Sequence, residues 1–241
     1  MHDVLTGDTG LPAGVGVSHV AVYRTDGPDG VCGGAPHVHF ACAEMYVAVG
    51  GRGSARFLTP AGPQEVALSA GAAVRFTPGT LHRLVSDPDD PLALIVLMEN
   101  GHLNEAGDAV FVFPPEDLAD PARYAELAVA ADEAAVRERR DRAVTGFTRL
   151  TSLWRADPEL GLHELHAFYA LATALVRPRA AAWPALIAAG PGAAAARLAE
   201  RAAAVQAADP AHLRAATVTP LAPAAPYPGM CGHVSRYTPV P

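Results

Sequence analysis

The chain has 241 residues, half of them apolar, and a formal net charge of -7 at neutral pH. This length allows a full hydrophobic core in one large domain or two unequal parts. No apolar run approaches the roughly 18 residues of a membrane span, so we expect a soluble protein with no membrane partner. All 18 basic residues are arginine, which excludes Schiff-base and P-loop lysine chemistry. The negative charge argues against a nucleic-acid partner.

The first half of the sequence predicts an antiparallel β-structure. Residues 1–16 are glycine-rich and are expected to form a loose lead-in, followed by a strand near 17–24. From Pro36 to Met98, short apolar segments alternate with Gly- and Pro-containing turns, and a further apolar segment occupies 109–113. Regular short strands of this kind are typical of a sandwich or barrel, which we place at 17–113.

The composition changes at Pro114, where an Ala-, Arg- and Glu-rich region begins. Asp120-Pro121 and Asp157-Pro158 are helix-start signals, and apolar residues recur at helical spacing, so we predict helices over 114–216. Acidic residues slightly outnumber arginines there, which argues against a DNA-binding unit. We expect the helices to cover one mouth of the barrel or to form a subunit interface. Residues 217–241 are Pro-rich and end in a strand-like tail, which is expected to pair with a barrel edge or with a second subunit in a homodimer.

Four residues between Gly34 and Leu84 are of types that bind divalent metals. His37 and His39 are two apart in a predicted strand, so their side chains point the same way. Glu44 follows a predicted turn at 41–43 that starts a neighbouring strand, and His82 follows a Pro-Gly turn. Three imidazoles and one carboxylate suit a transition metal better than Mg or Ca. We predict one divalent ion per chain (Fe, Mn, Ni, Co, Cu or Zn), with two coordination positions left open.

These segments resemble the two motifs of the cupin superfamily. HVHFACAE, from His37 to Glu44, is similar to the first motif, and GAAVRFTPGTLH, ending at His82, is similar to the second, apart from Thr77 where a proline is usual. The resemblance covers roughly residues 17–113. It implies that the four residues are the metal ligands. The resulting expectation is a mainly β protein, an antiparallel cupin (jelly-roll) β-barrel followed by an α-helical C-terminal region.

The resemblance does not select one reaction, because cupins include dioxygenases, isomerases, decarboxylases and binding proteins. Our first hypothesis is a metal-dependent enzyme acting on a small molecule, with an oxygenase placed ahead of an isomerase or lyase. Tyr46 is the candidate proton donor or substrate hydrogen bond, and Arg56 and Arg75 are candidates for orienting a substrate. The alternative is a non-catalytic small-molecule-binding or regulatory module.

Other chemistry-bearing residues are expected to be structural. His163 and His166 share a helix face but have no third ligand, and Cys231 with His233 is expected to pack in an edge strand. The three cysteines are irregularly spaced and do not predict a disulfide framework. The N-terminal sequence has no secretory pattern, and the composition is typical of a GC-rich bacterial genome, so we expect a cytoplasmic bacterial protein.

Overall fold

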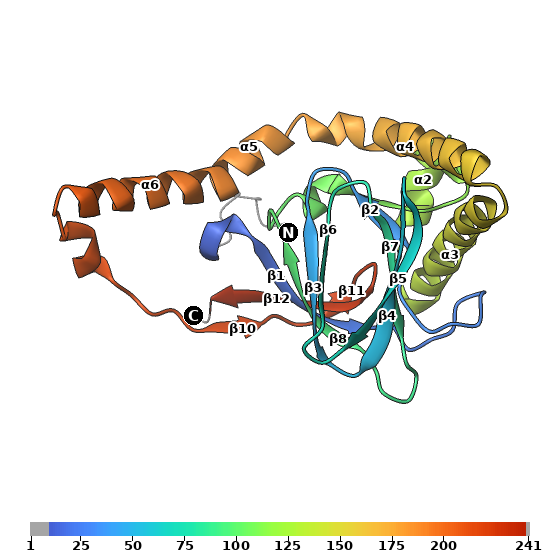
Figure 1. The fold of residues 1–241 in the computed structure, drawn as a ribbon, viewed down its shortest axis with the longest axis horizontal. Coiled ribbons are helices and arrows are strands. Elements are labelled where there is room, and N and C mark those ends of the chain that lie inside the picture. The colour runs from blue at the N-terminus through green and yellow to red at the C-terminus, as the bar shows by residue number, and fades with distance from the viewer. Residues whose placement is uncertain (1–9, 240–241) are drawn as a thin grey trace.

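Two antiparallel sheets pack against each other, with helices on one side (Figure 1). The structure is a computed structural model that describes residues 10–239, so residues 1–9 of the expected lead-in lie outside the described residues. The seven-stranded sheet has the order β10-β12-β1-β8-β3-β6, with β11 paired to β12, and the five-stranded sheet has the order β5-β4-β7-β2-β9. The strand bounds are Gly16–Val22 (β1), His37–His39 (β2), Glu44–Gly50 (β3), Arg52–Thr59 (β4), Gly62–Ser69 (β5), Ala73–Phe76 (β6), Leu81–Ser86 (β7), Ala93–Met98 (β8), Ala109–Phe111 (β9), Leu221–Pro223 (β10), Tyr227–Pro228 (β11) and Gly232–Pro239 (β12).

The first hydrophobic core lies between the two sheets. Alternate residues of the facing strands meet there, because successive side chains in a strand point to opposite faces. The seven-stranded sheet contributes Val20, Tyr46 and Leu94, and the five-stranded sheet contributes Phe57 and Leu84. Both sheets are therefore buried on their inner face.

A second core joins the five-stranded sheet to the helices. The helix bounds are Pro115–Leu118 (α1), Pro121–Ala128 (α2), Glu133–Ala156 (α3), Pro158–Ala180 (α4), Trp183–Ile187 (α5) and Ala193–Gln206 (α6). The side chains of Asp120, Asp132 and Asp157 accept backbone N–H bonds at the starts of α2, α3 and α4, as N-cap residues do. Val38 and Val110 of the sheet pack with Phe147 and Leu165 of the helices.

The expectation of a mainly β, closed barrel is only partly confirmed. The two antiparallel sheets are present, but helices make up 42% of the chain and strands 30%. The barrel is not closed, because hydrogen-bonded ladders leave β6 and β10 at the edges of one sheet and β5 and β9 at the edges of the other. The helical content follows from the Ala-rich sequence after Pro114, which has high helix propensity.

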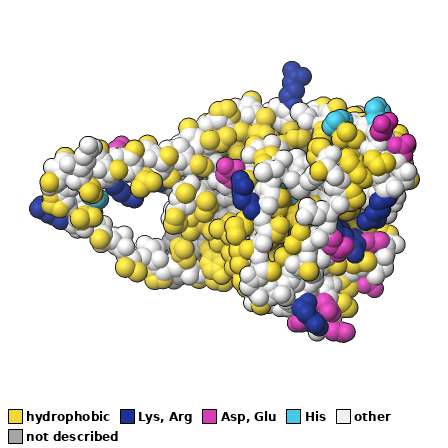
Figure 2. Space-filling model, viewed as in Figure 1, with side chains coloured by type: hydrophobic (Ala, Val, Ile, Leu, Met, Phe, Trp, Pro, Cys, Tyr) yellow, Lys and Arg dark blue, Asp and Glu magenta, His cyan; other side chains and the backbone are white. Residues whose placement is uncertain are grey.

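The C-terminal tail forms a strand within the seven-stranded sheet. Residues Ser18 to Val22 of β1 pair with Arg236 to Gly232 of β12, so the tail joins the sheet after the helices have been traversed. In Figures 1 and 2, α6 and the chain that follows it project from the body as an arm. Within residues 10–239, no helix is both long and apolar enough to cross a membrane.

Candidate metal centre

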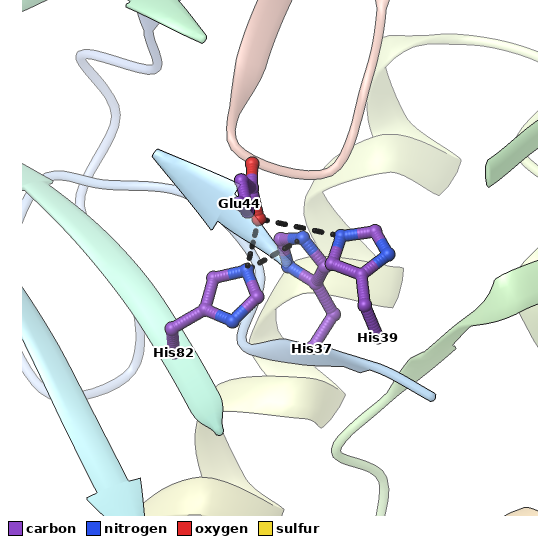
Figure 3. Close-up of side chains that lie close together, drawn as sticks. All are labelled: His37, His39, Glu44 and His82. Atoms are coloured by element: carbon purple, nitrogen blue, oxygen red, sulfur yellow. Dashed lines mark hydrogen bonds and ion pairs between the residues drawn. The ribbon is translucent and has the colours of Figure 1, made fainter. Parts of the chain in front are cut away.

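The four predicted ligands come together between the two sheets (Figure 3). His37 and His39 point inward from β2, while Val38 between them faces the helix-side core. His37 is paired in register with His82 of β7, the neighbouring strand. This alternation, with a period of two residues, places all three imidazoles on the inner face of the five-stranded sheet.

Glu44 reaches the cluster from the opposite sheet. The sequence predicted a neighbouring strand for Glu44, but β3 belongs to the seven-stranded sheet, so the chain crosses between sheets at residues 40–43. The carboxylate therefore faces the imidazoles across the interior. The turn prediction was correct, and the strand pairing was wrong because local sequence does not specify which sheet a strand joins.

The ligand atoms converge at short distances. The Nε2 atoms of His37 and His82 lie 3.0 Å apart, and Glu44 Oε2 lies 3.4 Å from the Nε2 atoms of His39 and His82. One donor atom from each of the four residues lies within 4.8 Å of all the others. Bonds of about 2.1 Å to a common ion put ligand atoms roughly 3 to 4.2 Å apart, so small side-chain rotations would complete a coordination sphere.

The protonation of His37 and His82 makes this convergence informative. Each Nδ1 lies 2.9 Å from a backbone carbonyl oxygen, that of Ala35 or Thr80. A carbonyl oxygen only accepts hydrogen bonds, so each Nδ1 carries the proton and each Nε2 presents a lone pair. Burial and the neighbouring histidines lower the pKa of His37 to about 3 and that of His82 well below its ordinary value. Two neutral imidazoles thus face each other through lone pairs, an arrangement that a cation stabilises.

Glu44 supports the same conclusion. Its side chain is buried, and its Oε2 has no hydrogen-bond partner within the described part of the chain. Burial raises the pKa of Glu44 to about 7. A buried carboxylate oxygen without a donor is unfavourable. The residues therefore fit a divalent transition metal, and this ligand set, with three nitrogens and one oxygen, is the one predicted from the sequence.

Asp108 is a site residue that the sequence analysis missed. It is fully buried just before β9, and its Oδ2 lies 3.3 Å from Nδ1 of His39. Burial alone would lower the pKa of His39, but Asp108 and Glu44 outweigh it and raise the pKa. Asp108 favours the tautomer in which Nδ1 carries the proton and Nε2 is free to bind an ion, as partners of metal-binding histidines do.

Asp108 also holds the crossing between the sheets. Its Oδ1 accepts hydrogen bonds from the backbone N–H groups of Phe40 and Ala41 at 3.1 and 2.7 Å, and its Oδ2 accepts one from Cys42 at 3.3 Å. These three residues connect His39 to Glu44. Asp108 thus sets both the tautomer of one ligand and the backbone path to another.

A cavity of about 1160 Å³ adjoins the cluster. His37, His39 and Glu44 line it, together with Tyr46 and Cys231. The Tyr46 hydroxyl interacts with Glu44 and lies 3.8 Å from Cys231 Sγ. Burial, with Cys231 and Glu44, raises the pKa of Tyr46 well above its ordinary value, so the phenol keeps its proton. Tyr46 is therefore placed where a proton donor or a substrate hydrogen bond is needed.

The two other arginines proposed to orient a substrate lie away from the cavity lining. Arg56 forms ion pairs with Glu65 and Asp29, and Arg75 is exposed on β6. The strand alternation did not reveal their facing, because neither β4 nor β6 has a clear apolar and polar period around them.

No second metal cluster is found in residues 10–239. His163 is exposed and lies 3.7 Å from Glu164, and His166 contacts Tyr169. Cys231 is buried beside Tyr46, and His233 contacts Tyr23.

No protein-family model matches the chain, and neither does any curated protein. Several solved structures do match in part. A cupin protein from Bacteroides fragilis is 20% identical, with 35% of this chain and 62% of that chain covered and a TM-score of 0.27. QdtA, a sugar 3,4-ketoisomerase from Thermoanaerobacterium thermosaccharolyticum, is 13% identical, with 39% and 64% covered and a TM-score of 0.33. The capsular polysaccharide assembling protein CapF from Staphylococcus aureus is 19% identical, with 35% and 23% covered and a TM-score of 0.30.

The matched part spans less than two thirds of each of these chains, and every TM-score is below 0.5, so the interpretation of the site rests on its own geometry. A protein with a double-stranded β-helix domain from Klebsiella pneumoniae is a further match. The solved structures that this chain resembles thus include cupin and double-stranded β-helix proteins, in agreement with its two histidine motifs.

Proposed function

We propose that this protein is a metal-dependent enzyme acting on a small organic molecule, with His37, His39, Glu44 and His82 as the ligands of one transition-metal ion. The observation that carries the proposal is the convergence of imidazole lone pairs and an unpartnered carboxylate oxygen beside a cavity. Three imidazoles and a carboxylate are donors that such ions bind well. The cavity is large enough for a small-molecule substrate.

A bound ion in this site supplies Lewis acidity or, if it is iron, redox chemistry with dioxygen. The chain's own residues supply the rest of the site. Asp108 orients His39, and Tyr46 offers a hydroxyl that can donate a hydrogen bond to a substrate oxygen. The cavity wall partly shields the substrate from water, because Val96, Met98 and Phe111 are among its lining residues.

An iron-dependent dioxygenase comes first among the reactions, ahead of an isomerase or lyase. Four protein ligands leave two positions of an octahedral ion, which suits an oxygen-bearing substrate together with a second small ligand. The homodimer, the cytoplasmic location and the lack of a nucleic-acid partner stay predictions.

Metal content tests the ligand assignment. Protein purified without chelator is expected to hold one transition-metal ion per chain, and His39→Ala and His82→Ala are expected to lose it together with turnover. His163→Ala is the matched control, because its side chain is 77% exposed and outside the cluster. Retention of metal by folded His82→Ala would show that the ligand assignment is wrong.

Oxygen consumption separates the reaction classes. Iron in the purified protein and oxygen uptake with cell extract would support an oxygenase, whereas zinc or manganese without uptake would favour an isomerase or lyase. A metabolite that binds the metal-loaded protein and is recovered unchanged would favour the non-catalytic alternative.

A further inference from the structure

One arginine of the helical region lines the cavity next to the metal cluster. Arg139 belongs to α3, far along the chain from the motifs, yet it shares the cavity wall with His37 and His39. Its guanidinium carbon lies 4.8 Å from the centre of the Phe111 ring, and Phe111 is paired in register with His37. Its charge is close enough to lower the pKa of His37.

The guanidinium is held in place by neutral groups. Nη1 donates to the carbonyl oxygen of Ala128 at 2.9 Å, and Nη2 donates to that of Gly229 at 3.3 Å. These bonds link α3 to the end of α2 and to the C-terminal segment. They fix the position of the side chain but do not neutralise its charge.

Arg139 has no acidic partner among residues 10–239. Its buried Nε has no hydrogen-bond acceptor there, and the groups that perturb its charge are Tyr23 and Tyr124. Burial lowers the pKa of Arg139 below its ordinary value. The neighbouring arginines differ, because Arg140 pairs with Asp141 and Arg142 pairs with Asp117. A partly buried cation without a counter-ion is unfavourable.

The other arginines of the cavity do not share this property. Arg236 forms an ion pair with Glu105, and the side chain of Arg179 is exposed, so that water solvates its charge. Arg139 is therefore the cavity arginine best suited to bind an anionic group of a ligand.

We propose that Arg139 binds a carboxylate of the substrate, so that the enzyme acts on a small organic acid held between the metal and this guanidinium. Arginine is well suited to this role, because its planar donors match the two oxygens of a carboxylate. A singly charged group balances one unpaired cation. A phosphate dianion would add repulsion from Glu44 and Glu105, which line the same cavity. This inference rests on the proposed metal-dependent function.

Simple dicarboxylates test the proposal without knowledge of the substrate. Zinc-loaded protein is titrated calorimetrically with malonate, succinate, glutarate and adipate, and with the monoamide of each. The monoamide keeps one carboxylate for the metal and removes the charge from the other end. At the chain length that spans the two anchors, we expect the diacid to bind at least about tenfold more tightly than its monoamide.

Variants assign the preference to Arg139. Arg139→Gln is expected to bind the best diacid and its monoamide equally, and Arg139→Lys to keep part of the preference because it keeps the charge. Arg236→Gln is the matched control and is expected to retain the full preference, since its charge is already paired with Glu105. A preference that survives in Arg139→Gln overturns the assignment.

The wild-type comparison stays informative even if Arg139→Gln does not fold. Equal dissociation constants for every diacid and its monoamide in zinc-loaded wild-type protein overturn the inference alone. Inorganic phosphate that binds more tightly than all four diacids overturns the carboxylate class. Wild-type protein that takes up no zinc, manganese or iron refutes the proposed function and the inference with it.

Discussion

Replacing Asp108 with asparagine removes one negative charge and changes one acceptor atom into a donor. In the wild-type protein, Oδ1 accepts from Phe40 and Ala41, and Oδ2 accepts from Cys42 and lies 3.3 Å from His39 Nδ1. The asparagine oxygen is expected to stay on the side of the shortest bond, the 2.7 Å contact with Ala41. Its amide nitrogen then faces the N–H groups of Cys42 and His39.

The size of the effect follows from the two bonds lost. Hydrogen bonds to a charged group contribute about 1.5–3 kcal/mol each, so losing two lowers the free energy of unfolding by about 3–6 kcal/mol. We expect the lower end, because His39 can relieve one contact by moving its proton from Nδ1 to Nε2. That tautomer blocks the nitrogen that faces the cluster. Metal affinity should therefore fall by roughly 10- to 100-fold, the range found for partners of metal ligands.

Zinc affinity, measured by competition with a chromogenic chelator, checks this prediction alongside urea unfolding. Asp117→Asn is the control, because Asp117 is equally buried but bonds to Arg123 and Arg142 away from the cluster. It should lose stability and keep its zinc affinity. A folded Asp108→Asn protein that binds zinc as tightly as wild type would refute the role assigned to Asp108.

Two further predictions concern the helical region. Burial alone would raise the pKa of Asp117, but its hydrogen bonds with Arg123 and Arg142 outweigh it and hold the pKa below its usual range. Stability from a depressed pKa is present above the unfolded-state pKa of about 3.9 and is lost as pH falls through the native pKa, so between about pH 6 and about pH 3 the urea midpoint should drop more in wild type than in Asp117→Asn. Gly146→Ala in α3 should destabilise the fold although alanine favours a helix by about 1 kcal/mol, because its Cβ would lie 2.2 Å from the Val112 carbonyl oxygen. Gly50→Ala, with open space at its Cβ, is the control for thermal unfolding, and an unchanged melting temperature in Gly146→Ala would contradict the close packing of α3 on the sheet.

The sequence predicted the ligands better than the architecture around them. His37 and His39 were predictable because a strand repeats every two residues, and His82 because the Pro-Gly turn starts the next strand. The extent of the sheets was not predictable in the same way. Pairing between strands depends on contacts between distant residues, and this is why the opposite-sheet position of Glu44 and the open barrel edges did not follow from local patterns.

Asp108 and Arg139 were missed for a related reason. Asp108 lies 67 residues from Ala41, whose N–H it accepts, and Arg139 lies 90 residues from Gly229. Arg139 also belongs to a charged run, Arg137 to Arg142, that resembles a solvated helix face. A sequence pattern shows the spacing of charges along a helix, but not that one of them lacks a counter-ion in a cavity.

The C-terminal segment explains why the site depends on nearly the whole chain. Gly34, just before the first motif, approaches Cys231 so closely that a Cβ would lie 2.5 Å from the Cα of Cys231. Only glycine allows the tail to pass there, and the passage places Cys231 against Tyr46 and Gly229 beneath Arg139. The segment that follows the helices thus forms part of the wall shared by the proposed proton donor and the proposed carboxylate anchor. The helical region and the tail therefore shape the cavity in which the ligands, supplied by the β-sheets, would meet a substrate.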